Sequence, residues 1–191
     1  GEIVFVNHPK YYDKALNSDA TIILIDKEVA CPEGKALLVS DDPFRDFNKI
    51  NEHYQGIQTF ETTNQNLKIG ENCKIHPSVI IGNDVTIGNN CMIFPNVVIG
   101  DRTVIGNNCI IQSGTVLGGD AFYYNKNAEG YRKMLSVGNV ILEDHVEIGV
   151  NCSIDRGVTD STIIKKGSKL DNLIQIGHDT VLGERTLVAS G

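Results

Sequence analysis

A histidine in a polar segment near the end of the chain is the residue best suited to acid–base chemistry. His178 follows Ile176 and Gly177, where a turn would point its imidazole outward from the fold. A neutral imidazole accepts a proton near pH 7, so His178 is predicted to act as a general base. The nearby acids that could orient its ring or neutralise a charge are Asp155, Asp171 and Asp179. A lone histidine is more often structural than catalytic, and that alternative stays open.

Histidine and cysteine side chains could instead bind a metal ion. His76 and His145 also fall in expected turns, but together with His178 they lack the close spacing of zinc ligands. The chain contains no C-x-x-C or C-x-C pair. We therefore predict no metal site, and a zinc-binding protein is kept as an alternative.

An aliphatic residue returns at every sixth position from Ile69 to Leu117. A small or β-branched residue stands two places before it, and Gly, Asn or Asp fills many of the other positions. A helix would give a period of about 3.6 and an amphipathic strand a period of about 2, so neither explains the pattern. A period of six is typical of a parallel β-helix with one short strand and one tight turn per hexad. The pattern resumes from Leu142 to Val188, with four additional residues after Ile154.

Cysteines test the length of one coil independently. Cys73, Cys91 and Cys109 are separated by three hexads each, so a coil of three hexads would stack their side chains about 4.8 Å apart. Cys152 has the same place in its own hexad. We predict that these cysteines are core residues rather than metal ligands or disulfide partners. Unpaired thiols also suit a reducing compartment.

Residues 1–62 lack the repeat and are predicted to form a small α/β domain. The expected strands cover 3–5, 21–25 and 37–39, and the first helix covers 10–17. Asp42 is expected to cap a second helix that begins at Pro43. Spacings of three and four residues give that helix an apolar face made of Phe44, Phe47, Ile50 and Tyr54.

Residues 63–191 are predicted to form a left-handed parallel β-helix, interrupted at about 119–138, where no hexad fits. The interruption is expected to leave one corner as an inserted loop, which a solenoid tolerates. Its tyrosines, Tyr123, Tyr124 and Tyr131, could form a wall against a sugar, a base or an acyl chain; a loop without function is the alternative. The chain opens directly at a strand, so we expect further residues before it. It stops in mid-repeat, so we expect either that the protein continues or that another structure caps the β-helix.

Composition limits the kinds of partner. The 191 residues are 41% hydrophobic and 21% charged, with a formal net charge of −7, whereas phosphate backbones attract clustered Lys and Arg. We therefore expect no nucleic-acid partner. The sequence contains neither an apolar run of about 18 residues nor a signal-peptide pattern at its start. Together with the unpaired thiols, these features predict a cytoplasmic location and no transmembrane segment.

Three segments resemble one known family: 138–149 (GNVILEDHVEIG), 153–164 (SIDRGVTDSTII) and 169–179 (KLDNLIQIGHD). The opening 3–11 (IVFVNHPKY) and 41–44 (DDPF) resemble the N-terminal uridine-binding domain of the same family. This family is the UDP-3-O-(3-hydroxyacyl)glucosamine N-acyltransferases of lipid A biosynthesis, which have hexapeptide repeats. The hexads alone are weak evidence because many acyltransferases share them, but the segments around Arg156 and His178 are specific.

The resemblance implies that a 3-hydroxyacyl chain moves from an acyl carrier protein to the 2-amine of a UDP-3-O-acylglucosamine, without a cofactor. It also implies a homotrimer with active sites in clefts between neighbouring β-helices. His178 falls on the catalytic base of the family, and Asp171 and Asn172 fall on polar positions that line the same cleft. Phe5 and Tyr11 fall on aromatic positions that hold the uracil.

The chain departs from the family pattern at several positions. His8 stands where the family usually has Asn, and it is retained as a substrate-binding candidate. Gly177 replaces the Ala that usually precedes the base, and the loop run 121–124 (AFYY) also differs. Two alternatives also stay open. One is another nucleotide-sugar N- or O-acetyl/acyltransferase of the hexapeptide family, and the other is a non-catalytic or metal-binding β-helix protein.

Overall fold

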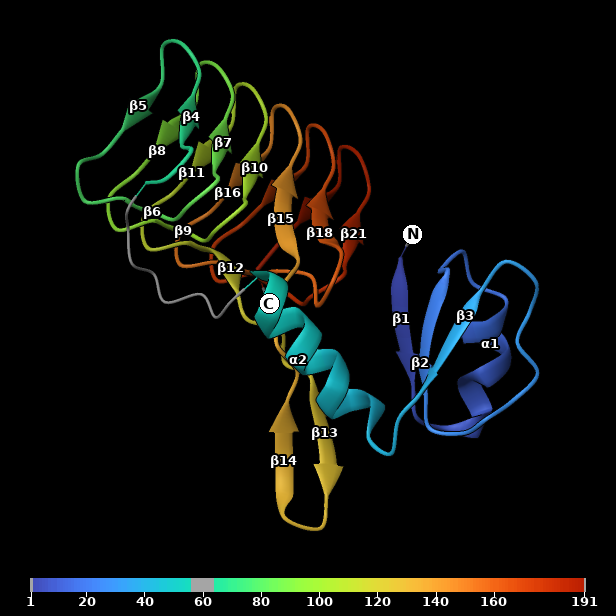
Figure 1. Ribbon diagram of the computed structural model, residues 1–191. Helices are drawn as coiled ribbons and strands as arrows, with labels where there is room; N and C mark the ends of the chain where they lie inside the picture. Colours follow the sequence, from blue (N-terminus) through green and yellow to red (C-terminus); the bar gives the residue numbers. More distant parts are fainter. Residues whose placement is uncertain (1, 56–63, 191) are drawn as a thin grey trace. The chain divides into compact units, whose positions relative to one another are not determined.

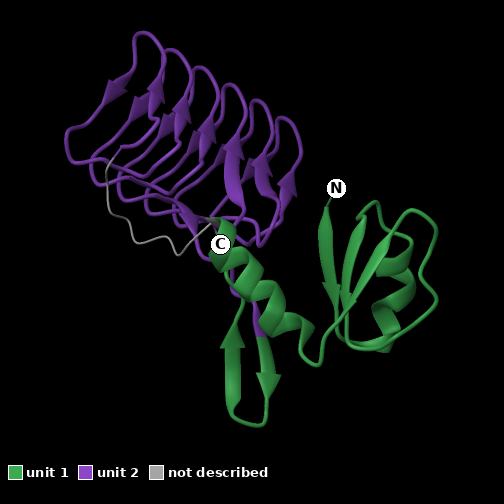
Figure 2. Ribbon diagram, in the orientation of Figure 1, with its two compact units in different colours: residues 1–57, 125–135 green, residues 58–124, 136–191 purple. Residues whose placement is uncertain are grey.

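The computed structural model describes residues 2–55 and 64–190, and the contacts divide the chain into two compact units (Figure 2). The first unit comprises residues 1–57 and 125–135, and the second comprises 58–124 and 136–191. The boundary expected between residues 62 and 63, and most of the polar linker around it, lie outside the described residues. The middle of the inserted segment groups with the first unit.

The first unit is built on a three-stranded parallel sheet in the order β1–β2–β3. Its elements up to the second helix are β1 (Ile3–Val6), η1 (Pro9–Tyr11), α1 (Tyr12–Leu16), β2 (Ile22–Ile25), β3 (Ala36–Val39) and α2 (Pro43–Gln55). Val6, Ile23 and Ile25 form the centre of its core. The predicted small α/β arrangement is therefore present, because the β-branched runs pair as strands.

Helix α2 begins as the sequence predicts. Asp42 Oδ1 accepts a hydrogen bond from the main-chain N–H of Arg45 at 3.0 Å. Phe44 and Phe47 are buried, but Tyr54 is 77% exposed, so the predicted apolar face is wrong at its last position. Asn51 Nδ2 donates to the carbonyl of Leu135 at 3.4 Å. Tyr54 lies beyond this contact, in the last turn of the helix.

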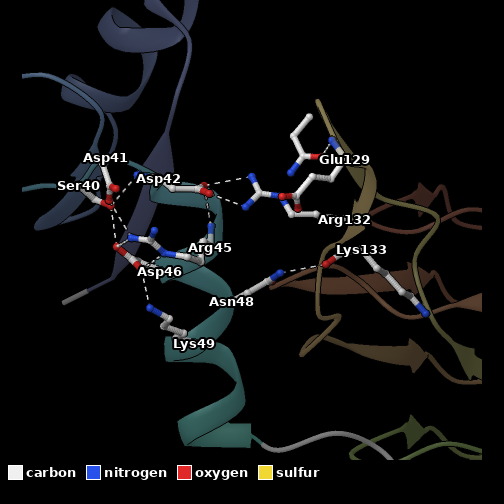
Figure 3. Close-up of polar contacts among 11 residues, drawn as sticks. Ser40, Asp41, Asp42, Arg45, Asp46, Asn48, Lys49, Glu129, Arg132 and Lys133 are labelled. Atoms are coloured by element: carbon white, nitrogen blue, oxygen red, sulfur yellow. Dashed lines mark hydrogen bonds and ion pairs between the residues drawn. The ribbon is translucent and has the colours of Figure 1, made fainter.

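The inserted segment contains a hairpin that contacts α2 within the first unit (Figures 1 and 3). Its strands are β13 (Tyr124–Asn127) and β14 (Gly130–Lys133). Arg132 donates to both carboxylate oxygens of Asp42, with Nη2 at 3.2 Å from Oδ1. Asn48 donates from Nδ2 to the carbonyl of Lys133 at 2.9 Å. It also accepts from the main-chain N–H of Leu135 at 3.0 Å. The segment expected as a loop is thus an ordered hairpin held by charged and amide groups.

The second unit is a left-handed parallel β-helix with three sheets, one on each face of a prism (Figure 1). The first sheet contains β4 (Lys68–Ile69), β7 (Thr86–Ile87), β10 (Val104–Ile105), β15 (Asn139–Leu142), β18 (Ser161–Ile164) and β21 (Val181–Leu182). The second contains β5 (Lys74–Ile75), β8 (Met92–Ile93), β11 (Ile110–Ile111), β16 (Glu147–Ile148), β19 (Lys169–Leu170) and β22 (Leu187–Val188). The third contains β6 (Ile80–Ile81), β9 (Val98–Ile99), β12 (Val116–Gly119), β17 (Ser153–Asp155) and β20 (Gln175–Ile176).

The repeated aliphatic residue fills the centre of the prism. Ile99, Ile111 and Leu117 have no exposed surface, which explains why an aliphatic residue returns at every sixth position. The prediction of unpaired core cysteines is confirmed for Cys91 and Cys109, which are free and buried, as is Cys152. Cys73, in the first coil, is free but only partly buried.

The Asn and Asp residues of the repeat form the turns. Asn90 and Asn108 both have φ of 57°, a left-handed conformation that Asn adopts more easily than most residues. The side chain one place earlier bonds to the coil before it. Asn89 Oδ1 accepts from the N–H of Glu71 at 2.7 Å, and Asn107 Oδ1 accepts from the N–H of Asn89 at 2.8 Å. Most polar residues of the repeat therefore have a structural role.

Neither α1 nor α2 has the length and apolar character of a membrane-spanning helix, and the described residues contain no other helix that does.

Candidate functional site at one corner of the β-helix

Three connections leave the same corner of the β-helix, and two of them, the insertion and residues 156–160, break the regular repeat. This corner lies between the third and the first sheet. The insertion connects β12 to β15, residues 156–160 connect β17 to β18, and residues 177–180 connect β20 to β21. Segments far apart in sequence therefore meet at one edge. We call this edge the His178 corner and define it as residues 118–123, 136–138, 155–160 and 177–179.

His178 is held by the residue that follows it. Its Nδ1 lies 2.7 Å from Asp179 Oδ2, and the His178 side chain is 30% exposed. Asp179 is itself fixed, because its Oδ1 accepts from the N–H of Val158 at 3.1 Å and its own N–H donates to Thr162 Oγ1 at 2.9 Å. With Nδ1–H donated to the carboxylate, Nε2 is the nitrogen left to accept a proton. The geometry therefore suits the general base that the sequence predicts.

Two further side chains surround His178. The Tyr123 ring, from the insertion, lies edge-on with its centroid 6.2 Å from that of His178. Asp155 accepts hydrogen bonds from Gln175 Nε2 at 3.1 Å and from Ser153 Oγ at 3.4 Å. Burial raises the pKa of Asp155 above its usual range, although these bonds and His178 partly oppose the increase. The corner thus combines a base, an aromatic wall and two carboxyl groups.

Asp171 and Asn172 lie at a different corner of the same chain, between β19 and β20. Asp171 accepts from the N–H of Asn172 at 2.8 Å and from Ser190 Oγ at 3.1 Å, and these bonds lower its pKa. Asn172 Oδ1 accepts from the N–H of Val150 at 2.7 Å, as the Asn residues of other turns do. One chain does not bring these two residues together with His178. Their predicted role in the same cleft requires a second chain and stays a prediction.

The three candidates for uracil binding lie in the first unit. Phe5 is partly buried and packs against Phe44 and Phe47, with ring centroids 5.9 Å and 5.0 Å apart. The rings of His8 and Tyr11 lie 5.9 Å apart, and Tyr11 is 52% exposed. His8 Nδ1 also accepts from the N–H of Lys10 at 3.2 Å. His8 can therefore cap the short helix in the way that Asn would, which gives it a structural use besides the predicted one.

The residues considered for metal binding are dispersed. No group of three or more His, Cys, Asp or Glu residues that could hold a metal ion occurs within 2–55 and 64–190. His76 bonds through Nδ1 to Ser78 Oγ at 2.8 Å, and His145 is a turn residue with φ of 61°. His76 also borders a mostly apolar hollow of about 370 Å³ over β5 and β8. That hollow lies at the opposite end of the prism from His178.

Sequence analysis did not assign Arg156 and Gln175 to this corner. Gln175 faces outward from β20 and donates to Asp155. Arg156 is almost fully buried, with 1% exposure. The available signal for Arg156 was the four-residue extension of the repeat that contains it, at the same corner as the insertion.

Two family models match separate parts of the chain. Residues 1–53 match the family model described as UDP-3-O-(3-hydroxymyristoyl) glucosamine N-acyltransferase, LpxD. Residues 66–93 and 84–119 match the model described as bacterial transferase hexapeptide (six repeats). The two models therefore recognise the α/β unit and the first coils of the β-helix separately.

Two curated relatives that align with nearly the whole chain are named UDP-3-O-acylglucosamine N-acyltransferase, and a third aligns with a shorter part. The UDP-3-O-acylglucosamine N-acyltransferase of Christiangramia forsetii is 41% identical over 218 residues, covering 100% of this chain and 64% of the relative. UDP-3-O-acylglucosamine N-acyltransferase 1 of Sulfurimonas denitrificans is 42% identical over 210 residues, covering 99% and 66%. The Porphyromonas gingivalis enzyme is 56% identical over 73 residues, covering 38% and 21%.

The chain thus spans about 61–66% of the length of the relatives that align with 99–100% of it. The match continues through both units and through the segments that form the His178 corner. The chain belongs to the hexapeptide-repeat family of UDP-3-O-acylglucosamine N-acyltransferases.

Proposed function

We propose that the full-length protein transfers a 3-hydroxyacyl chain from an acyl carrier protein to the 2-amine of a UDP-3-O-acylglucosamine in lipid A biosynthesis. The observation that carries the proposal is the His178–Asp179 pair at 2.7 Å, placed where the insertion leaves a β-helix of this family. We infer the acceptor from the names of the relatives, and we infer from the His178–Asp179 geometry that His178 can take a proton from an amine.

The reaction forms one C–N bond and breaks one C–S bond. The neutral 2-amine attacks the thioester carbonyl, and His178 Nε2 takes the proton that the nitrogen loses. The thiolate of the carrier leaves and receives that proton in turn, so no oxidant or covalent enzyme intermediate is needed. Because the thioester is already activated, the proposal requires no cofactor. General-base catalysis of this kind contributes typically about 10²–10⁴-fold.

Asp179 contributes by holding the imidazole. Its carboxylate fixes the tautomer with a proton on Nδ1 and stabilises the imidazolium after proton transfer. The oxyanion that forms on the carbonyl needs a hydrogen-bond donor, and a backbone N–H of a turn from a neighbouring subunit is the simplest one. A homotrimer would supply that neighbour and would bring Asp171 and Asn172 of one chain toward His178 of another.

The first unit is proposed to hold the uridine. Tyr11 offers an exposed ring with His8 beside it, and stacking on an aromatic face suits a nucleobase. Phe5 completes the predicted set from its place against α2. We also place the reaction in the cytoplasm, where unpaired thiols such as Cys91 stay reduced.

Acyl transfer by the full-length gene product tests the proposal. Wild type, His178→Ala and the control His76→Ala would be compared with 3-hydroxyacyl carrier protein and UDP-3-O-acylglucosamine as substrates. We expect kcat/KM to fall by about 10²-fold or more in His178→Ala and to change little in His76→Ala, because His76 lies at the other end of the prism.

Two results would contradict parts of the proposal. Transfer that survives in His178→Ala would reject this residue as the base but retain the reaction. A folded wild type that does not transfer to this acceptor, but does acylate another nucleotide sugar, would favour the second transferase class. His8 and the tyrosines of the insertion would then be the first positions to examine for acceptor choice.

A further inference from the structure

Arg156 is a buried cation for which the described residues provide no carboxylate partner. It is 1% exposed, and it forms no ion pair with any acid in the described part of the chain. Removing a guanidinium from water costs several kcal/mol unless nearby groups compensate. Its Nη2 has no hydrogen-bond partner among the described residues. Such a residue calls for a reason beyond the stability of the coil in which it lies.

The other donors of Arg156 bond to both ends of the insertion. Nε donates to the carbonyl of Gly118 at 3.1 Å, where the chain leaves the prism, and Nη1 donates to the carbonyl of Ser136 at 3.2 Å, where it returns. The main-chain N–H of Arg156 donates to the carbonyl of Gly119 at 2.8 Å. One side chain therefore joins two segments that are separated by the whole hairpin.

A second bond closes the same neck. Ser136 Oγ accepts from the N–H of Ala121 at 3.0 Å, and both residues are buried. Ala121 lies two residues before Tyr123, whose ring is 6.2 Å from that of His178. The chain of contacts thus runs from Arg156 through the neck to the aromatic wall beside the base.

We infer that Arg156 is a positioning residue whose guanidinium clamps the neck of the insertion and so holds Tyr123 beside His178. The functional importance of this clamp rests on the proposed role of His178, but its existence does not. The planar fork of arginine suits two separate carbonyls, which the single ammonium nitrogen of lysine matches less well.

Stability alone is a poor readout of the clamp. Arg156→Met removes a desolvated charge, which is favourable, but leaves two buried carbonyls without a donor, which is unfavourable. These effects oppose each other in the free energy of unfolding. The position of the Tyr123 ring beside His178 must therefore be measured directly.

Nuclear magnetic resonance of the full-length protein with labelled histidine measures it without substrate. Tyr123→Ala first defines the contribution of the Tyr123 ring to the His178 resonances. We expect Arg156→Met to move these resonances toward those of Tyr123→Ala. We also expect exchange of the Ala121 amide to accelerate by about tenfold or more, as the loss of charge-assisted bonds predicts. Arg156→Lys should show smaller changes of the same kind.

Lys166→Met is the matched control, because Lys166 is an exposed basic residue at another corner. A folded Arg156→Met whose His178 and Ala121 signals equal those of the control would overturn the inference. If Arg156→Met does not fold, proton exchange of the Arg156 guanidinium in the wild-type protein tests the inference instead. Separate, slowly exchanging Nε and Nη protons support a fixed clamp, whereas averaged and rapidly exchanging protons refute it. None of these readouts depends on acyl transfer, so failure of the proposed function stays distinguishable.

Discussion

Two glycines at the His178 corner should respond in opposite directions to the same substitution by alanine. Gly177 directly precedes the base, and a Cβ built on it would lie 4.0 Å from Gln175 Nε2, an ordinary contact. Gly138 ends the insertion, and a Cβ there would lie 1.9 Å from the carbonyl oxygen of Asp160 and 2.5 Å from that of Gly157. Both glycines lack the positive φ that would disfavour alanine by itself.

The magnitudes follow from these distances. Gly177→Ala should raise the free energy of unfolding by about 0.4–1 kcal/mol, because alanine restricts the unfolded chain and fits the folded one. Gly138→Ala requires a backbone carbonyl to move by about 1 Å. The neighbouring bonds, such as Val137 N–H to Val158 O at 2.8 Å, resist that movement. Overpacking of this kind costs about 1–3 kcal/mol.

Urea denaturation at one fixed protein concentration measures both changes. A fixed concentration matters because association between chains shifts apparent stability. Gly138→Ala with wild-type stability would show that the neck of the insertion is looser than the contacts require. A loss of more than about 1 kcal/mol in Gly177→Ala would show that the turn before His178 does not tolerate the Ala that the family resemblance leads us to expect there.

Four other outcomes are expected. Burial raises the pKa of Asp155, so the folded state favours the protonated form, and the stability linked to that proton is lost as pH rises from about 4 through the raised pKa. Asp155→Asn should therefore raise the melting temperature at pH 7, with a gain that disappears at acidic pH. Asp42→Ala removes a helix cap and a partner of Arg132, so chemical denaturation should show a loss of about 1–2 kcal/mol. Arg132→Met keeps the cap and should lose only about 0.5–1 kcal/mol, since the ion pair is partly exposed. A thiol reagent should modify the exposed Cys31 in the native protein, and the buried cysteines of the prism should react only on unfolding.

The β-helix could be predicted because every hexad repeats the same pattern of an inward aliphatic residue and a tight turn. Each inward aliphatic residue, such as Ile99 or Ile111, meets the same neighbours one coil away, so one correctly interpreted coil specifies the others. The α/β unit could be predicted for a related reason. Its strands are short runs of β-branched residues, and Asp42 followed by Pro43 marks a helix start through local bonds alone.

The hairpin and its contact with α2 could not be predicted, because they depend on pairs that are distant in sequence. Asn48 bonds to Lys133 and Leu135, and no periodicity connects them. The burial of Arg156 is a similar case. An arginine in a turn normally faces water, and only the insertion above it makes a buried position with two carbonyls to satisfy.

Proximity in sequence was misleading for Asp171 and His178. One coil uses three strands, so the turns on either side of a single strand lie on different edges of the prism. Turn residues share an edge when they are one coil apart, as Glu71 and Asn89 are. His178 therefore lies nearer to Tyr123 and Asp155, from earlier coils, than to the corner that contains Asp171.

The regular coils explain why chemistry concentrates at one edge. Their polar turn side chains already bond to the preceding coil, as those of Asn89 and Asn107 do, so few side chains are left to act on a substrate. Both breaks of the repeat, the insertion and residues 156–160, lie at the His178 corner, and they bring Tyr123 and Val158 against the regular turn that contains His178 and Asp179. A six-residue insertion between Asp160 and His178 would keep the hexad pattern intact but move the imidazole to the next edge. We expect such a variant to keep the hexads while Tyr123 and the base are separated, because the position of the breaks relative to His178, rather than the repeat itself, specifies the site.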